Sequence, residues 1–342
     1  MKKLIRCIAF FIIGFLIFQV LTYVFVPKWI SKIDPATPRF KEFYELEKNS
    51  VDVLAIGASD VGRGYSPVKV WKEYGITSFN LGTSNQTFSL AYYLISEAIK
   101  YQKPKVIVLD MDALFVEKDA PEGEYRKLFD NLKLDDVKIQ AINDEKVRAG
   151  DKLPYIFPLL RFHDRYNKLE EKDFKTKSLN KKYKELSYMG MAMSYEIKPY
   201  IDTKEYMKDK GEVEKVPDEN VYYLEKIINL CKENDIQILW VEIPSATSWS
   251  YARYKKTAEL AQKYNIEFID YNLEEMMKNL GIDWMTDTAD KGNHLNVVGA
   301  EKISNHIGKI LSEKYNCKDN RKDIEKSKLW NEVVQRYDNN RK

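Results

Sequence analysis

Cysteine, histidine and phosphate-binding glycine loops are scarce in this 342-residue sequence. Three cysteines, Cys7, Cys231 and Cys317, show no paired spacing, which argues against a disulfide framework and against a zinc site. Three histidines leave few groups that can move a proton near neutral pH. No segment repeats, and neither of the glycine-rich nucleotide-binding patterns occurs. A disulfide-rich, repetitive or nucleotide-binding protein is therefore disfavoured.

Excess charge is also missing from most of the chain. The formal net charge is +3, and Lys2, Lys3 and Arg6 account for it because no acidic residue precedes Val26. The remainder of the chain is balanced, so it lacks the strong basic character that is typical of nucleic-acid binding. No nucleic-acid partner is expected.

What the sequence does contain is one long apolar run, from Cys7 to Val26, without a charged residue. As a helix, a run of about 20 residues is long enough to cross the core of a bilayer. The run exceeds the core of a cleaved signal peptide, and no small-residue cleavage site follows it. Residues 1–26 are therefore predicted to be a cytoplasmic tail and a transmembrane anchor. A buried helix of a soluble protein is the alternative.

Positively charged residues flank this run on both sides, so their count alone does not orient it. A short N-terminal tail before a large folded domain is the usual arrangement of a signal anchor. The predicted location is the cell membrane, crossed once, with the folded domain on the extracellular side. A domain that faces the cytoplasm is the alternative, and protease digestion of intact cells would distinguish the two.

Beyond the apolar run, short apolar segments alternate with helical patterns, which predicts an α/β domain with a parallel, doubly wound sheet. The expected strands are residues 51–56, 76–81, 105–110, 236–243 and 266–270. The expected helices are residues 87–104, 221–231, 252–264 and 296–315. Cys231 falls on an apolar helix face, where a buried thiol is expected.

Parts of the chain do not follow this alternation. Residues 27–50 are predicted to be a polar connector, and residues 51–315 to be the α/β domain. Within that domain, residues 113–218 are rich in Lys, Asp and Glu, and we predict a mostly helical insertion that covers the site or carries a partner surface. Residues 316–342 are a highly charged tail, expected to be one exposed helix with frayed ends.

Polar residues follow the predicted strands at the edge where a doubly wound sheet binds its ligands. Ser59 follows the first strand in a sharp turn that begins at Gly57, and its own N–H can help to hold an oxyanion. Gly82 and Asn85 follow the second strand and offer a backbone N–H and a side-chain amide for the same purpose. His294 comes after the fifth strand, where it can remove the proton of a serine. The convergence of these residues from distant parts of the chain predicts a serine-based acyl-transfer site.

Each of these residues also has an ordinary structural explanation. Ser59 is a suitable N-cap for a helix, and His294 can be a surface residue in a polar turn. Asp110 and Asp112 close the third strand and lie two residues apart, but no third ligand for a metal ion is evident. No metal and no cofactor are therefore predicted.

Three segments resemble the sequence blocks of the SGNH/GDSL hydrolases: GASD at 57–60, NLGTSNQ at 80–86 and HLNVVGAEK at 294–302. The region 51–315 is similar to the membrane-anchored bacterial branch of that family, which includes accessory proteins of alginate acetylation and of teichoic-acid D-alanylation. The resemblance implies a three-layer, flavodoxin-like α/β fold and an acyl group that is cleaved or transferred through a serine. In this chain it implies three roles: nucleophile for Ser59, general base for His294 and oxyanion donor for Gly82.

The sequence departs from the family pattern at two places. The family's acid lies three residues before the histidine, where this chain has Lys291. Asp290 is the preferred acid if the loop at Gly292 bulges by one residue, and Asp287 is the alternative. The asparagine that the family has after its third strand is replaced by Asp110-Met111-Asp112, so that oxyanion donor is missing or is supplied by Asn85.

The site residues and the resemblance together predict a membrane-anchored serine esterase or O-acyltransferase that acts on cell-envelope polysaccharide through an acyl-serine intermediate. The expected partners are the membrane, a cell-envelope polysaccharide or acylated glycan, and a membrane-bound O-acyltransferase, the last by resemblance alone. A non-catalytic envelope scaffold that binds glycan or such an acyltransferase is the alternative.

Overall fold

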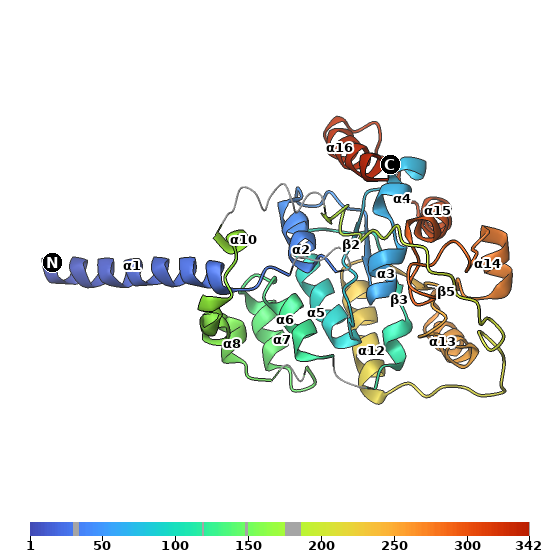
Figure 1. Ribbon diagram of the computed structural model, residues 1–342, viewed down its shortest axis with the longest axis horizontal. Helices are drawn as coiled ribbons and strands as arrows, with labels where there is room; N and C mark the ends of the chain where they lie inside the picture. Colours follow the sequence, from blue (N-terminus) through green and yellow to red (C-terminus); the bar gives the residue numbers. More distant parts are fainter. Residues whose placement is uncertain (30–33, 118–119, 148–149, 175–185, 342) are drawn as a thin grey trace.

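A five-stranded parallel sheet with the strand order β2-β1-β3-β4-β5 forms the centre of the molecule (Figure 1). This is a computed structural model, and it describes residues 1–342 except 30–33, 118–119, 148–149, 175–185 and 342. The strands are β1 (Val53–Ile56), β2 (Ser78–Asn80), β3 (Val106–Asp110), β4 (Gln237–Glu242) and β5 (Glu267–Asp270). Each strand lies inside one of the five predicted segments. The predicted α/β fold with a parallel sheet is therefore confirmed.

Helices connect the strands and extend the chain at both ends. In chain order they are α1 (Lys2–Phe25), α2 (Ala36–Glu45), α3 (Ser59–Gly64), α4 (Pro67–Tyr74), α5 (Phe88–Ala98), η1 (Asp112–Phe115), α6 (Glu122–Phe129), α7 (Asp136–Asn143), α8 (Leu153–Ile156), α9 (Leu159–Phe162), η2 (His163–Asn167), α10 (Glu171–Phe174), α12 (Asp218–Glu233), α13 (Tyr251–Tyr264), α14 (Glu274–Leu280), α15 (Val297–Glu313) and α16 (Ile324–Asn340). The four predicted helices correspond to α5, α12, α13 and α15.

Helices cover both faces of the sheet. Ile107 and Leu109 of β3 belong to a core with side chains of α5, α12 and α13 on one face. Val106 and Val108 belong to a second core with side chains of α3, α4 and α15 on the other face. Successive side chains of a strand point to opposite faces, so a strand that is covered on both sides is apolar throughout. This explains why β3 is a continuous apolar run in the sequence.

Capping side chains fix the start of the helix that follows the histidine loop. Asn296 precedes α15, and its side chain accepts hydrogen bonds from the N–H groups of Val298 (3.0 Å) and Gly299 (3.2 Å). A side-chain oxygen at this position binds N–H groups that have no acceptor within the helix. The cap therefore anchors the chain two residues after His294.

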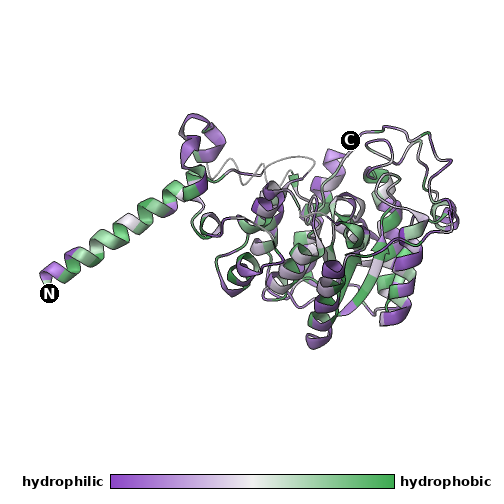
Figure 2. Ribbon diagram, turned by 90° about the horizontal axis from the view of Figure 1, so that it is seen from below, coloured by the Kyte–Doolittle hydropathy of each residue, from purple (hydrophilic) through white to green (hydrophobic). Residues whose placement is uncertain are grey.

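The N-terminal helix α1 extends away from the rest of the molecule (Figure 1). Its 24 residues are mostly apolar, and none of them is buried. Figure 2 shows α1 as hydrophobic along nearly its whole length. The helix is long and apolar enough to cross a membrane, as a signal sequence would also be, and its orientation stays a prediction.

Three expectations for the chain outside the sheet are wrong in part. The connector 27–50 contains α2, and Phe40 and Phe43 of that helix are buried in the core, so the segment belongs to the domain. The insertion is helical up to Phe174, but the described residues from 192 to 217 form no helix or strand. The C-terminal segment does form a helix, α16, yet Trp330 of that helix is buried and stacks on Trp71 with ring centroids 5.0 Å apart.

Candidate active site

Ser59 lies at the first position of α3, directly after the turn that ends β1. Gly57 allows this turn because a Cβ there would lie 2.4 Å from the Cβ of Asp110 on the neighbouring strand. A side chain at position 57 would therefore push the first strand and the third strand apart. The glycine lets the chain bend sharply and places Ser59 at the carboxyl edge of the sheet.

His294 lies in a loop that its own backbone and Thr288 hold closed. The carbonyl oxygen of His294 accepts hydrogen bonds from the N–H of Ala289 (3.0 Å) and from Thr288 Oγ1 (3.1 Å). Thr288 Oγ1 also accepts a hydrogen bond from the N–H of Gly292 at 2.7 Å. These contacts fix the backbone on both sides of the loop and so limit where the histidine ring can point.

The backbone of this loop takes up one extra residue between the acid and the histidine. Lys291 and Gly292 both have left-handed φ angles, 63° and 84°. Glycine adopts such a conformation without steric cost, and a Cβ at Gly292 would also lie 2.8 Å from Cγ of Tyr200. The two consecutive left-handed residues form the bulge that was expected near Gly292.

The imidazole of His294 bridges a serine and a carboxylate. Its Nε2 lies 2.8 Å from Oγ of Ser59, and its Nδ1 lies 2.6 Å from Oδ2 of Asp290. The other carboxylate oxygen of Asp290 accepts a hydrogen bond from the backbone N–H of His294 at 2.7 Å. A carboxylate at Nδ1 favours the tautomer whose proton is on that nitrogen, which leaves Nε2 free to accept the serine proton.

Arg63 supports the acid from the opposite side. Its Nη1 donates to Oδ2 of Asp290 at 3.0 Å, and the guanidinium is almost fully buried. Burial raises the pKa of Asp290, but the hydrogen bonds from His294 and the charges of His294 and Arg63 outweigh it and hold the pKa below its usual value. Asp290 is therefore ionised at neutral pH.

Asp287, the alternative acid, is occupied elsewhere. Its Oδ2 pairs with Lys302 Nζ at 2.6 Å and accepts the N–H of Asp283 at 2.9 Å, and its Oδ1 accepts the hydroxyl of Thr286 at 3.0 Å. The side chain is fully buried. Of the two candidate acids, the structure brings only Asp290 to the histidine ring.

Gly82, an expected oxyanion donor, lines the cavity, and its N–H has a partner within the protein. Its N–H donates to the side chain of Asn80 at 2.9 Å. A Cβ at Gly82 would lie 2.6 Å from the backbone nitrogen of Gly62, so glycine is required here for the close approach of the loop to α3. Ser59, whose N–H is in the first turn of α3, and the exposed Asn85 remain as donors at the cavity.

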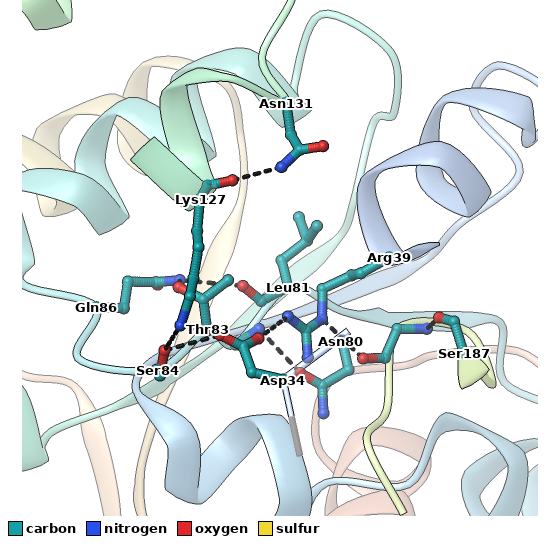
Figure 3. A network of polar contacts seen from close by, with 12 residues as sticks. Asp34, Arg39, Asn80, Leu81, Thr83, Ser84, Gln86, Lys127, Asn131 and Ser187 are labelled. Atoms are coloured by element: carbon teal, nitrogen blue, oxygen red, sulfur yellow. Dashed lines mark hydrogen bonds and ion pairs between the residues drawn. The ribbon is translucent and has the colours of Figure 1, made fainter. Parts of the chain in front are cut away.

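A buried ionic network supports the loop that carries Gly82 and Asn85 (Figure 3). Asp34 pairs with Arg39 of α2 at 3.1 Å and accepts the hydroxyl of Ser84 at 2.7 Å. Lys127 of α6 lies within 3.2 Å of both Asp34 and Ser84. The loop is thus held from the connector and from the insertion, two segments in which no site residue had been predicted.

Ser59 and His294 open into a cavity of about 610 Å³. Its polar lining comes mainly from α2, α3, the loop after β2 and the histidine loop, and Asp112 and Ser248 complete it. The apolar side chains that line it are small or short: Ala58, Ala113, Val116, Ala120 and Pro121. A cavity with this lining has room for a short acyl group beside a polar acceptor.

A group of buried carboxyls lies beside and beneath the nucleophile. Burial, followed by the charges of neighbouring acids, raises the pKa of Asp60 and of Glu242 well above the usual range. Burial and Asp112 raise the pKa of Asp110 in the same way, although the amides of Ile243 and Ala58 lower it. Among the described residues, no group of three or more His, Cys, Asp or Glu side chains has a metal-binding geometry.

Two residues of the site were missed from the sequence. Arg63 lies four residues after Ser59 on α3, so the helical spacing could have indicated that both side chains share a face. Asn80 donates to the carbonyl oxygens of Val61 (2.7 Å) and Tyr65 (2.8 Å) and so ties β2 to α3. An asparagine at the end of a strand gives no comparable signal.

Comparisons with known proteins add little to this geometry. No protein-family model matches the sequence, and no curated protein matches it. Among solved structures, a proposed acylhydrolase from Bacteroides fragilis NCTC 9343 is similar to this chain, with 14% sequence identity and a TM-score of 0.37. The similarity covers 80% of this chain and 94% of that one. A likeness at this level carries no argument about function.

Proposed function

We propose that this protein is a membrane-anchored serine esterase or O-acyltransferase of the SGNH type. The observation that carries the proposal is the bridge that His294 makes between Ser59 Oγ at 2.8 Å and Asp290 Oδ2 at 2.6 Å. A nucleophile, a base and an acid that orients the base are the parts that serine-based acyl transfer needs.

The reaction proceeds in two steps through an acyl-Ser59 intermediate. In the first step Ser59 Oγ attacks the carbonyl carbon of an ester while His294 Nε2 takes the hydroxyl proton. His294 then gives that proton to the departing oxygen, and the acyl group stays on Ser59. In the second step a hydroxyl of the acceptor, or water, loses its proton to Nε2 and attacks the acyl-serine carbonyl. The bond between the acyl group and Ser59 Oγ then breaks, and His294 returns the proton to Ser59. Asp290 stabilises the imidazolium in both steps.

The proposed substrate is a short acyl ester and the proposed acceptor is a cell-envelope polysaccharide. The small apolar side chains in the cavity support a short acyl group. The polysaccharide, and a membrane-bound O-acyltransferase as the partner that supplies acyl groups, follow from the resemblance to the membrane-anchored SGNH branch. In this proposal α1 anchors the chain in the cell membrane, with the domain on the extracellular side.

A second candidate function is that of a non-catalytic scaffold that binds glycan in the same cavity. One observation favours it: the N–H of Gly82 is already bound to Asn80, which leaves fewer donors for a developing oxyanion.

Hydrolysis of p-nitrophenyl acetate by the full-length protein in detergent micelles distinguishes the two functions. Ser59→Ala and His294→Ala should each lower kcat by about 10³-fold or more, because removal of a triad member leaves little chemistry. Ser248→Ala is the matched control, since Ser248 lines the same cavity without contacting His294. An acetyl group should also be found by mass spectrometry on the peptide that contains Ser59. Equal, slow hydrolysis by all four proteins would overturn the catalytic proposal.

A further inference from the structure

One surface of the insertion lies beside the part of α1 that would be inside a bilayer. The rings of Phe18 in α1 and Phe157 pack edge to face, with centroids 6.1 Å apart. Arg165 of η2 donates from its guanidinium to the carbonyl oxygen of Phe25, at the end of α1. The helix also contacts α9 and α10. Figure 1 shows this group of short helices at the end of α1.

The contacts on α1 set the depth of this surface. Phe18 precedes Phe25 by seven residues, which is about 10 Å along a helix. A hydrocarbon core of about 30 Å takes up about 20 residues of a helix. The charge-free run of α1 ends at Val26, so a bilayer that contains it reaches past Phe18 towards the domain. Phe157 then lies within the bilayer and Arg165 lies near its boundary.

The side chains on this surface fit that environment. Leu153, Phe157, Leu160, Tyr166 and Phe174 are large and apolar, and each is between 44% and 72% exposed. Such a group of apolar side chains is unusual on a surface that faces water alone.

Charged residues accompany these apolar side chains, and Arg161 of α9 is mostly buried, with Glu122 at 3.7 Å. Arg165 pairs with the buried Asp173 at 3.3 Å, and the exposed Lys168 follows η2. Exposed apolar and aromatic side chains together with cations are the composition of a segment that lies in a membrane interface.

We propose that residues 153–174 are embedded in the interface of the same bilayer that α1 crosses, and that they hold the domain at a fixed height above it. The exposed side chains of α8 and α9 enter the acyl chains, and η2 and α10 lie among the headgroups. The inference rests on the membrane anchoring in the proposed function and is independent of the acyl-transfer chemistry. The lipid is the occupant because the depth set by Phe18 places the surface in the bilayer.

Nitroxide labels on the full-length protein in nanodiscs of phosphatidylcholine and phosphatidylglycerol test this placement. Leu160→Cys reports on the surface, and Ile201→Cys is the matched control because Ile201 is an exposed aliphatic residue next to Tyr200, whose N–H binds the carbonyl oxygen of Trp284 in the C-terminal part of the domain. Both are made in a Cys7→Ser background. A third sample, labelled at the native Cys7, which is exposed on α1, reports whether α1 itself is in lipid. The measurement is the accessibility of each label to oxygen, which partitions into lipid, and to a water-soluble nickel chelate.

The ratio of oxygen to nickel accessibility at Leu160→Cys should exceed that at Ile201→Cys by about threefold or more, as for a side chain among acyl chains. Equal ratios with Cys7 in lipid would overturn the proposal and leave the anchoring intact. A label at position 160 that neither reagent reaches would also overturn it, in favour of a protein partner on this surface. A Cys7 label in water would overturn the anchoring and the inference together. Hydrolysis of p-nitrophenyl acetate should be unchanged in Leu160→Cys. The assay therefore checks that the variant is folded, and it is independent of where the surface lies.

Discussion

Asp290 and the buried acids Asp60, Asp110 and Glu242 all lie near the carboxyl edge of the sheet, but their surroundings differ. Asp290 is half-buried and is bound by the ring and N–H of His294 and by Arg63. Neither carboxylate oxygen of Glu242 has a hydrogen-bond partner among the described residues. Hydrogen-bond donors and cations, and not closeness to the nucleophile, therefore decide which carboxylate is ionised and which stays neutral.

The largest expected effect comes from neutralising the partnered acid. Asp290→Asn keeps the shape of the side chain but loses the charge that stabilises the imidazolium, and kcat should fall by about 10³-fold or more. Asp287→Asn is the control: it breaks the buried pair with Lys302, lowers the free energy of unfolding by about 1–3 kcal/mol and leaves kcat nearly unchanged. Steady-state kinetics and chemical denaturation of both variants check this. The opposite pattern would make Asp287 the acid.

Gly292→Ala tests whether the loop holds Asp290 and His294 in register. The left-handed φ of 84° and the approach to Tyr200 disfavour a Cβ, at a cost of about 1–3 kcal/mol. We expect kcat/KM to fall by about ten- to a hundredfold, because a displaced ring no longer reaches Ser59. Gly281→Ala, at a φ of 64° on the far end of α14, should cost similar stability without this loss. A similar loss of kcat/KM in both variants would show that the loop has no special role.

Arg63→Gln removes the cation that pairs with Asp290 at 3.0 Å. Arg63 helps to hold the pKa of Asp290 down, so in the variant this carboxyl takes up its proton at a higher pH. The fall of kcat/KM on the acid side of the pH profile should move to higher pH, and kcat at neutral pH should drop by about tenfold. Arg63→Lys should restore part of kcat at neutral pH and move the acid side of the profile part of the way back. If the acid side of the pH profile is unchanged in Arg63→Gln, Arg63 does not help to set the pKa of Asp290.

The smallest effect is expected from Asp110→Asn, which replaces one of the buried acids. Burial and the neighbouring charge of Asp112 raise the pKa of Asp110 in the folded protein. The neutral carboxyl therefore adds stability that is fully present below the pKa of the unfolded state and is lost as pH rises through the pKa of the folded state. The amide stays neutral at every pH. At pH 8 the variant should unfold at a higher Tm than the wild type, which corresponds to about 1 kcal/mol of added stability. Near pH 4 the two proteins should have the same Tm. A variant that is less stable at pH 8 would mean that Asp110 is ionised and bound in the fold.

The sheet was predictable because strands covered on both faces must be apolar, as β1 and β3 are. Ser59, His294 and Asp290 could be named from the sequence because each follows a predicted strand at one edge. Arg63 and the ion pair of Asp34 with Arg39 could not, because such pairs depend on how helices pack. The position of α16 was missed for the same reason: its buried Trp330 lies within a sequence that is mostly charged.

The two left-handed residues between Asp290 and His294 also bear on how such sites are recognised. A search pattern that demands an acid three positions before the histidine rejects this chain. The ring nevertheless meets a carboxylate on one nitrogen and a serine hydroxyl on the other. A loop that absorbs an insertion lets sequence spacing drift while the atomic contacts persist. Distant relatives of this protein are therefore better sought by those contacts than by counting residues.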